Sequence, residues 1–216
     1  MRSKWQSLPT EQINPSTLAI DKLEPADIVE QMLNEDRRML AAVHREKERI
    51  AVGVEIITQA LRKHGRVIFV TCDPHTELQT FVDITIAPAV GPEVIAGSTR
   101  LKAGTATKIV LNMLTTGAMV RIGKTYGNLM VDVQTGSEKL RDRARRILSI
   151  VTGLEYDEAD KLLRRAHWNV KAAIVMQKSG LTYPRALARL RRSHDFVRDA
   201  IGEDVEERLK EVLRLG

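Results

Sequence analysis

Residues 66–72 read RVIFVTC, and this stretch decides the fold class of the chain. It is almost wholly apolar and rich in β-branched residues, which is typical of a strand buried in a parallel sheet. The dipeptide Asp73-Pro74 ends the stretch. Residues 82–87, VDITIA, form a second predicted strand, and the 75–81 segment between the two fits one helical turn. Two such strands with helices around them predict an α/β fold.

Long helical patterns flank the two strands. Apolar residues recur at helical intervals over 26–64, and the length of this segment predicts a break or hairpin near 45–53. A stop signal at 63–65 ends the pattern. A second long helix is predicted over 98–122. We therefore expect helices to dominate the chain and the sheet to be small.

The remainder of the chain reads as helical throughout. We expect helices at 137–151, 155–166, 169–178, 183–200 and 203–214. Trp168 is expected to fill the core of this part, because a large aromatic ring carries much apolar area. Three parts are predicted: an irregular arm at 1–24, an α/β domain at 25–136 and a helical domain at 137–216.

Composition narrows the class of protein. No stretch approaches the roughly 18 apolar residues of a membrane-spanning helix, and no secretory signal is evident at the start. We therefore expect a cytoplasmic protein without a membrane partner. One cysteine, Cys72, excludes an internal disulfide, and the five histidines lack metal-ligand spacing. Neither a metal nor another cofactor is expected.

The net charge of +6 is unevenly distributed. Residues 137–200 hold 15 basic and 8 acidic side chains, whereas residues 1–136 are nearly balanced. A basic helical segment can bind nucleic acid, or it can form a solvated arginine-rich face. Because the segment lacks interleaved aromatic residues, the solvated face is the favoured interpretation and nucleic acid is not expected as a partner.

Residues 91–108, GPEVIAGSTRLKAGTATK, carry the candidate site. Glu93 lies in a turn between the second strand and the long helix, at the edge where open α/β sheets bind ligands. This position makes Glu93 the best single candidate for a ligand contact. The alternative is a structural carboxylate near the helix start, where the helix dipole favours negative charge.

Polar side chains crowd the first turns of the long helix. Its first turn is surrounded by Ser98, Thr99, Arg100 and Lys102. Hydroxyl and N–H groups at such a position could hold a phosphate or a carboxylate. Lys108, one and a half turns later, can share a side of the helix with Asn112, and polar residues in so apolar a helix indicate a site or a subunit contact. The alternative is a capped helix with solvated arginine and lysine side chains.

Residues 91–134, together with TEQINP at 10–15, closely resemble the bacterial N-acetylmuramic acid 6-phosphate etherases. Segment 28–70 is similar to that family's first helices and strand, and the tail to about Ile201 is similar to its C-terminal domain. The resemblance implies a carbon–oxygen lyase that releases D-lactate from a phosphosugar during cell-wall recycling. It also implies a doubly wound sugar isomerase (SIS) sheet, a ligand such as N-acetylmuramic acid 6-phosphate, and a homodimer.

The Gly-Pro-Glu turn is also similar to that of the isomerase half of glucosamine-6-phosphate synthase, where the glutamate is catalytic. This resemblance implies that Glu93 contacts a sugar hydroxyl or moves a proton. Substrate contacts are implied for the same segment: Glu93, Ser98, Thr99, Lys102 and Lys108.

The chain departs from the family pattern after the first strand. The family's Gly-Ala-Gly-Thr-Ser-Gly phosphate loop is missing, since 67–70 run directly into 71–74, which look like a later family strand. The comparison implies an internal deletion of on the order of a hundred residues. Both phosphate loops and the two glutamates assigned as acid and base fall in the lost part. We therefore expect a truncated sheet, and etherase activity that is absent or much reduced.

Residues 157–176, with a Trp-Asn-Val turn at 168–170, resemble ubiquitin-associated-like three-helix modules. That resemblance implies a small all-α bundle at the C-terminal end. Two functions follow from the whole sequence. The first is a phosphosugar lyase of the etherase type with impaired catalysis. The second is a non-catalytic module that binds a phosphosugar or dimerises.

Overall fold

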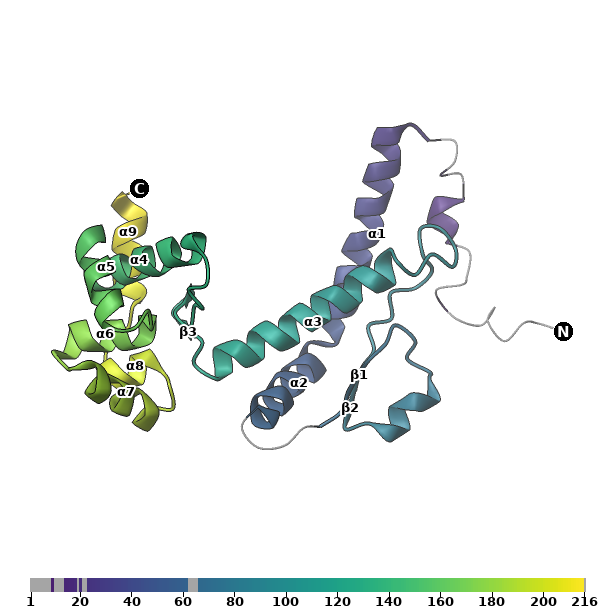
Figure 1. The fold of residues 1–216 in the computed structure, drawn as a ribbon. Coiled ribbons are helices and arrows are strands. Elements are labelled where there is room, and N and C mark those ends of the chain that lie inside the picture. The colour runs from purple at the N-terminus through teal and green to yellow at the C-terminus, as the bar shows by residue number, and fades with distance from the viewer. Residues whose placement is uncertain (1–8, 10–13, 19, 21–22, 62–65, 216) are drawn as a thin grey trace. The chain divides into compact units, whose positions relative to one another are not determined.

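The computed structural model describes residues 9, 14–18, 20, 23–61 and 66–215, and Figure 1 shows its ribbon. The chain forms two compact units, Met1–Ala118 and Met119–Gly216. Each unit has its own cluster of buried apolar side chains, so each is described by itself. The three parts expected from the sequence, at 1–24, 25–136 and 137–216, stay a prediction.

The first unit begins with the short 3-10 helix η3, Pro15–Thr17, and two long helices follow. α1 spans Pro25–Arg45 and α2 spans Lys47–Ala60, with Glu46 between them at φ −86° and ψ 4°. This confirms the break expected near 45–53. The stop signal predicted at 63–65 lies outside the described residues.

The sheet of the first unit is a parallel pair. β1, Ile68–Val70, pairs with β2, Ile84–Ile86, in a register that sets Ile68 opposite Ile84. The short 3-10 helix η5, Glu77–Phe81, lies between them in the chain. Both strands and the intervening turn were expected, but β1 is half-buried rather than buried. In the described part of the chain this sheet has only two strands. In a larger parallel sheet, neighbouring strands and helices on both faces would bury a strand such as β1.

The long helix α3, Lys102–Arg121, completes the core of the first unit. Its buried residues Ala106, Val110 and Leu114 join side chains from α1, α2 and β2 in one apolar cluster. Gly117 lets α2 approach closely, because a Cβ there would lie 2.7 Å from Cγ2 of Val54. The helix begins four residues after the predicted start at 98, since the chain before it forms separate turns.

The second unit is a hairpin followed by helices. β3, Thr125–Tyr126, and β4, Leu129–Met130, pair antiparallel. Seven consecutive residues of α6, 170–176, are buried, so this helix is the centre of the unit. The helices are α4 Glu138–Thr152, α5 Tyr156–Arg165, α6 Val170–Ser179, α7 Tyr183–Arg192, α8 Val197–Ile201 and α9 Glu206–Leu215.

The single helix expected over 183–200 is wrong, because the structure has two helices there. α7 ends at Arg192 and α8 begins at Val197. His194 and Asp195 between them adopt φ values of 50° and 65°. This left-handed backbone interrupts the helical hydrogen bonds, and only a few non-glycine residues adopt it.

Trp168 packs against the core of the second unit but is not enclosed by it. It is half-buried, and its backbone has φ 62°. The guanidinium carbons of Arg141, Arg145 and Arg164 lie 5.2, 5.3 and 5.8 Å from a ring centroid of Trp168. The indole therefore lies under a cover of arginines, where cation–π attraction adds to its packing.

Helices dominate both units, as expected, and the sheets are small. Within the described residues, no helix combines the length and the apolar character that crossing a membrane requires. The finer expectations, a shortened sugar isomerase sheet and a ubiquitin-associated-like bundle, stay proposals.

Candidate functional site

Glu93 lies in the loop between β2 and α3, and it is completely buried. Its Oε2 accepts a hydrogen bond from the backbone N–H of Lys102 at 2.8 Å, and its Oε1 accepts one from that of Ala103 at 3.0 Å. These N–H groups open α3, where no intrahelical acceptor is available. The carboxylate thus satisfies the start of the helix and places negative charge at its positive end.

Lys102 reaches away from that loop to Glu35 of α1. Its Nζ lies 2.8 Å from Oε2 of Glu35, and the two side chains are 3% and 4% exposed. Burial of two charges costs free energy that must be offset by good geometry and by further hydrogen bonds. Glu35 has such bonds, because Asn14 donates to its Oε2 at 2.9 Å and Arg38 to its Oε1 at 2.5 Å.

The pKa of Glu35 depends on its burial and on these hydrogen bonds. Burial alone raises the pKa of the carboxyl, but the hydrogen bonds from Lys102 and Asn14 and the nearby positive charges outweigh burial. The net effect lowers the pKa of Glu35 below its ordinary value. Glu35 is therefore a stable carboxylate, held ionised by Lys102 and its neighbours.

Asn14 connects segment 14–17 to these buried charges. Besides its bond to Glu35, its Nδ2 donates to the carbonyl of Pro92 at 3.4 Å. Its Oδ1 accepts the N–H of Ser16, and Thr17 donates to the carbonyl of Val94 at 2.8 Å. Segment 14–17 is thus bonded both to α1 and to the loop that carries Glu93. We call Asn14, Glu35, Glu93 and Lys102 the buried polar network.

The other residues predicted for the site lie outside this network. Ser98 is half-buried, while Thr99 and Lys108 are exposed. The carbonyl of Thr99 accepts the N–H of Gly104, so this part forms a turn that leads into α3. Six residues of helix rotate Lys108 by about 120° from Lys102, which puts the two side chains on different faces. Their role as substrate contacts stays a prediction.

A cavity of about 440 Å³ lies beside β2 in the first unit. Oε2 of Glu46 accepts the N–H of Ala87 at 3.2 Å and pairs with Arg49 at 3.1 Å. No sequence pattern pointed to Glu46 or Arg49 as cavity residues, except that both lie at the predicted helix break. The lining residues are Glu46, Arg49, Pro74, Gln79, Ile84, Thr85, Ala87 and Ala89.

Among the described residues, no group of three or more His, Cys, Asp or Glu side chains is placed to hold a metal ion. Cys72 is half-buried, and its Sγ lies 3.6 Å from the carbonyl oxygen of Ala103. Burial raises the pKa of this thiol, which disfavours the reactive thiolate.

Sequence comparison places the chain beside a set of curated bacterial proteins, although no family model matches it. N-acetylmuramic acid 6-phosphate etherase of Clostridium botulinum is 48% identical over 136 residues, which are 63% of this chain and 45% of that protein. The etherase of Salinibacter ruber is 51% identical over 137 residues, 63% of this chain and 44% of that protein.

N-acetylmuramic acid 6-phosphate etherase 2 of Vibrio cholerae is 48% identical over 139 residues, 64% of this chain and 45% of that protein. Each match therefore covers less than half of the curated relative. Identity near one half over this length marks common ancestry of the matched part.

The buried ion pair makes a prediction about stability. Replacing Glu35 by Gln, or Lys102 by Met, leaves the other charge buried without its partner. Each single change should lower the free energy of unfolding by about 3–5 kcal/mol. The double variant should lose less than the sum of the two, because it strands no charge. Urea unfolding followed by circular dichroism measures all three variants.

Lys108→Met is the matched control, since Lys108 lies on the same helix and is exposed. It should change stability by less than about 0.5 kcal/mol. The lowered pKa of Glu35 adds a pH test. The stability due to Glu35 is present above the ordinary glutamate pKa and is lost as pH falls through the folded-state value. Additive single variants, or an unchanged acid dependence in Glu35→Gln, would contradict this role for the pair.

Proposed function

We propose that the chain, which is similar in sequence to N-acetylmuramic acid 6-phosphate etherases over the matched residues, binds a phosphosugar and has little or no lyase activity. The chain spans less than half of its relatives in these matches, so their activity does not carry over with the similarity alone. The proposed ligand is N-acetylmuramic acid 6-phosphate or a close analogue. The burial and bonding of Glu93 carry the proposal.

Cleavage of an ether β to a carbonyl requires a base for the α-proton and an acid for the departing oxygen. Glu93 is the one carboxylate that the sequence offers in the expected turn. Both of its oxygens accept backbone hydrogen bonds, and none of its surface is open to solvent. A carboxylate that is used to hold a helix start has no free oxygen within reach of a substrate proton. Glu93 is therefore a positioning residue in this proposal.

The place where a phosphate would ordinarily bind is also occupied. Helix starts hold phosphates through their unbonded N–H groups. At α3 the N–H groups of Lys102 and Ala103 already bond to Glu93. β1 is followed directly by residues 71–74, and these contain no glycine-rich loop. The hydrogen bonds that hold Glu93 inside the unit therefore also occupy the N–H groups that would otherwise be open to a phosphate.

The proposed substrate contacts are Ser98 and Thr99 of the turn before α3, together with Lys108 on α3. Thr99 and Lys108 are open to solvent, and Ser98 is half-buried. Glu93 and Lys102 hold this turn from within the unit, so the five predicted residues divide into three contacts and two supports. The proposed scaffold is a shortened sugar isomerase sheet, which the parallel pairing of β1 with β2 supports. The proposed C-terminal part is a ubiquitin-associated-like bundle around α6.

The test uses the purified chain with N-acetylmuramic acid 6-phosphate. D-Lactate release is followed enzymatically, and the melting temperature is measured with and without the ligand. N-acetylglucosamine 6-phosphate, which lacks the lactyl group, serves as the matched ligand. We expect no lactate above background and a rise in melting temperature with the phosphosugar. A bound ligand raises the stability of the folded state by mass action.

Two outcomes would contradict the proposal. Lactate release that tracks the protein, and that falls in Glu93→Gln, would show that catalysis survives through Glu93. No lactate and no change in melting temperature would show that the chain does not bind the phosphosugar. The chain would then be only a structural relative of the etherases. Thr99→Ala should reduce the thermal shift without lowering the melting temperature of the free protein, because Thr99 is exposed.

The apolar surface of α1 favours self-association as a second candidate function. Val29, Leu33 and Leu40 are 57%, 47% and 49% exposed. At 100° per residue they fall within about 40° of one another on the helix. These three side chains form an exposed apolar stripe, broken at Asp36, of the kind that another protein chain covers. We propose that a second copy of the chain covers it in a homodimer.

Light scattering on the purified chain measures this directly. We expect the mass of a dimer or larger, and a shift toward the monomer in Leu33→Glu, which places a charge in the stripe. Glu30→Gln, next to the stripe, should leave the mass unchanged. A monodisperse monomer for the unaltered chain would rule out the homodimer.

A further inference from the structure

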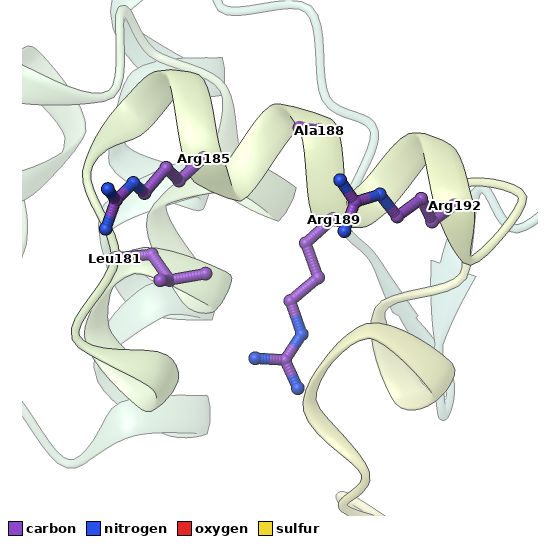
Figure 2. A pocket seen from close by; sticks show the side chains of 5 residues that line it. All are labelled: Leu181, Arg185, Ala188, Arg189 and Arg192. Atoms are coloured by element: carbon purple, nitrogen blue, oxygen red, sulfur yellow. The ribbon is translucent and has the colours of Figure 1, made fainter.

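A groove runs along α7 in the second unit, whereas every residue assigned to the site above belongs to the first unit. Its volume is about 550 Å³. The lining residues are Leu181, Arg185, Ala188, Arg189 and Arg192, and Figure 2 shows their side chains. Three of the five are arginines, whose guanidinium groups stay charged at any physiological pH.

The three arginines follow the helical repeat. Arg185, Arg189 and Arg192 stand at positions i, i+4 and i+7, which share one face of an α-helix. Figure 2 shows their side chains leaving successive turns of α7, with Leu181 beside Arg185. Seven residues of helix separate the first arginine from the last by about 10 Å along the axis. The groove is therefore an elongated row of positive charge with an apolar side.

These charges have no acidic partners in the part of the chain that the structure describes. None of the three arginine side chains forms an ion pair or hydrogen bond with a described residue, although the backbone carbonyl of Arg189 accepts the N–H of Ser193. Two arginines of the preceding helices are paired: Arg164 lies 2.6 Å from Asp160, and Arg145 contacts the same carboxylate. The sequence from 161 to 194 holds nine Lys and Arg residues and not one Asp or Glu. The missing counter-charge is thus a local feature of this segment.

We propose that the groove binds a small molecule with two phosphate groups near its opposite ends. Guanidinium groups pair with phosphate oxygens in a two-pronged geometry that few other side chains match. Arginines two turns apart suit two separated phosphates, while Leu181 and Ala188 provide apolar contact for the carbon skeleton between them. The volume is that of a small-molecule site.

A nucleic acid fits the groove less well. Single strands bind through aromatic side chains on which the bases stack, and no aromatic residue lines the groove. The row of three charges is also shorter than a typical nucleic-acid footprint. This inference concerns the second unit and does not depend on the proposed phosphosugar function.

The experiment is a calorimetric titration of the full chain with fructose 1,6-bisphosphate as the probe. Inorganic phosphate is the single-anion comparison, and a single-stranded oligonucleotide is the polymer comparison. Arg189→Gln and Arg191→Gln form a matched pair, because each removes one exposed charge from α7 but Arg191 does not line the groove. Circular dichroism checks that both variants fold.

We expect the bisphosphate to bind at least tenfold more tightly than inorganic phosphate. Arg189→Gln should weaken bisphosphate binding about tenfold, and Arg191→Gln should change it less than twofold. Equal losses in the two variants would show that net charge alone attracts the anion. That result would overturn the proposal that the groove is a specific binding site. No binding of the bisphosphate, or a preference for the oligonucleotide over it, would also overturn the proposal.

Discussion

The first unit depends on charges that are buried together near the start of α3. Glu35 and Lys102 face each other at 2.8 Å with almost no exposed surface, and Glu93 bonds the two N–H groups that open the helix. Because such charges are costly when unpaired, each one fixes the position of the next. Asn14 extends the arrangement to the start of the chain through Glu35 and the carbonyl of Pro92. α1, α3, the loop after β2 and segment 14–17 are held by one set of polar contacts.

Under the proposed function, this use of polar groups explains how the chain can resemble an enzyme by sequence and have little or no lyase activity. The edge of an open α/β sheet places carboxylates and free N–H groups where a ligand can reach them. Here the carboxylate and the N–H groups satisfy one another. The residues that mark the segment in sequence are retained, and they stabilise a helix start. What remains open to solvent is a turn bearing Thr99 and a helix face bearing Lys108.

Local features of the sequence predicted more of the structure than long-range ones did. The β-branched runs at 66–72 and 82–87 located both strands, because a periodic apolar pattern reports local geometry. The break at Glu46 followed from helix length alone. The interruption at His194 and Asp195 was missed, since neither residue marks a left-handed turn as glycine does. The burial of Lys102 was also missed, because its partner Glu35 lies 67 residues earlier and no spacing rule connects them. The sequence did offer the alternative that Glu93 is a structural carboxylate at the start of a helix. The structure agrees with it, because both carboxylate oxygens accept N–H groups that open α3.

Amide hydrogen exchange at Lys102 and Ala103 in the full chain tests most directly whether Glu93 holds the start of α3. First-turn amides of a helix ordinarily exchange fast, because they lack intrahelical acceptors. If the Glu93 carboxylate accepts both N–H groups inside the unit, both amides should exchange as slowly as those in the middle of α3. They should lose this protection in Glu93→Ala while the amides of the second unit keep theirs. Fast exchange at both positions in the unaltered chain would show that Glu93 does not hold these N–H groups. That result would contradict the structural role of Glu93.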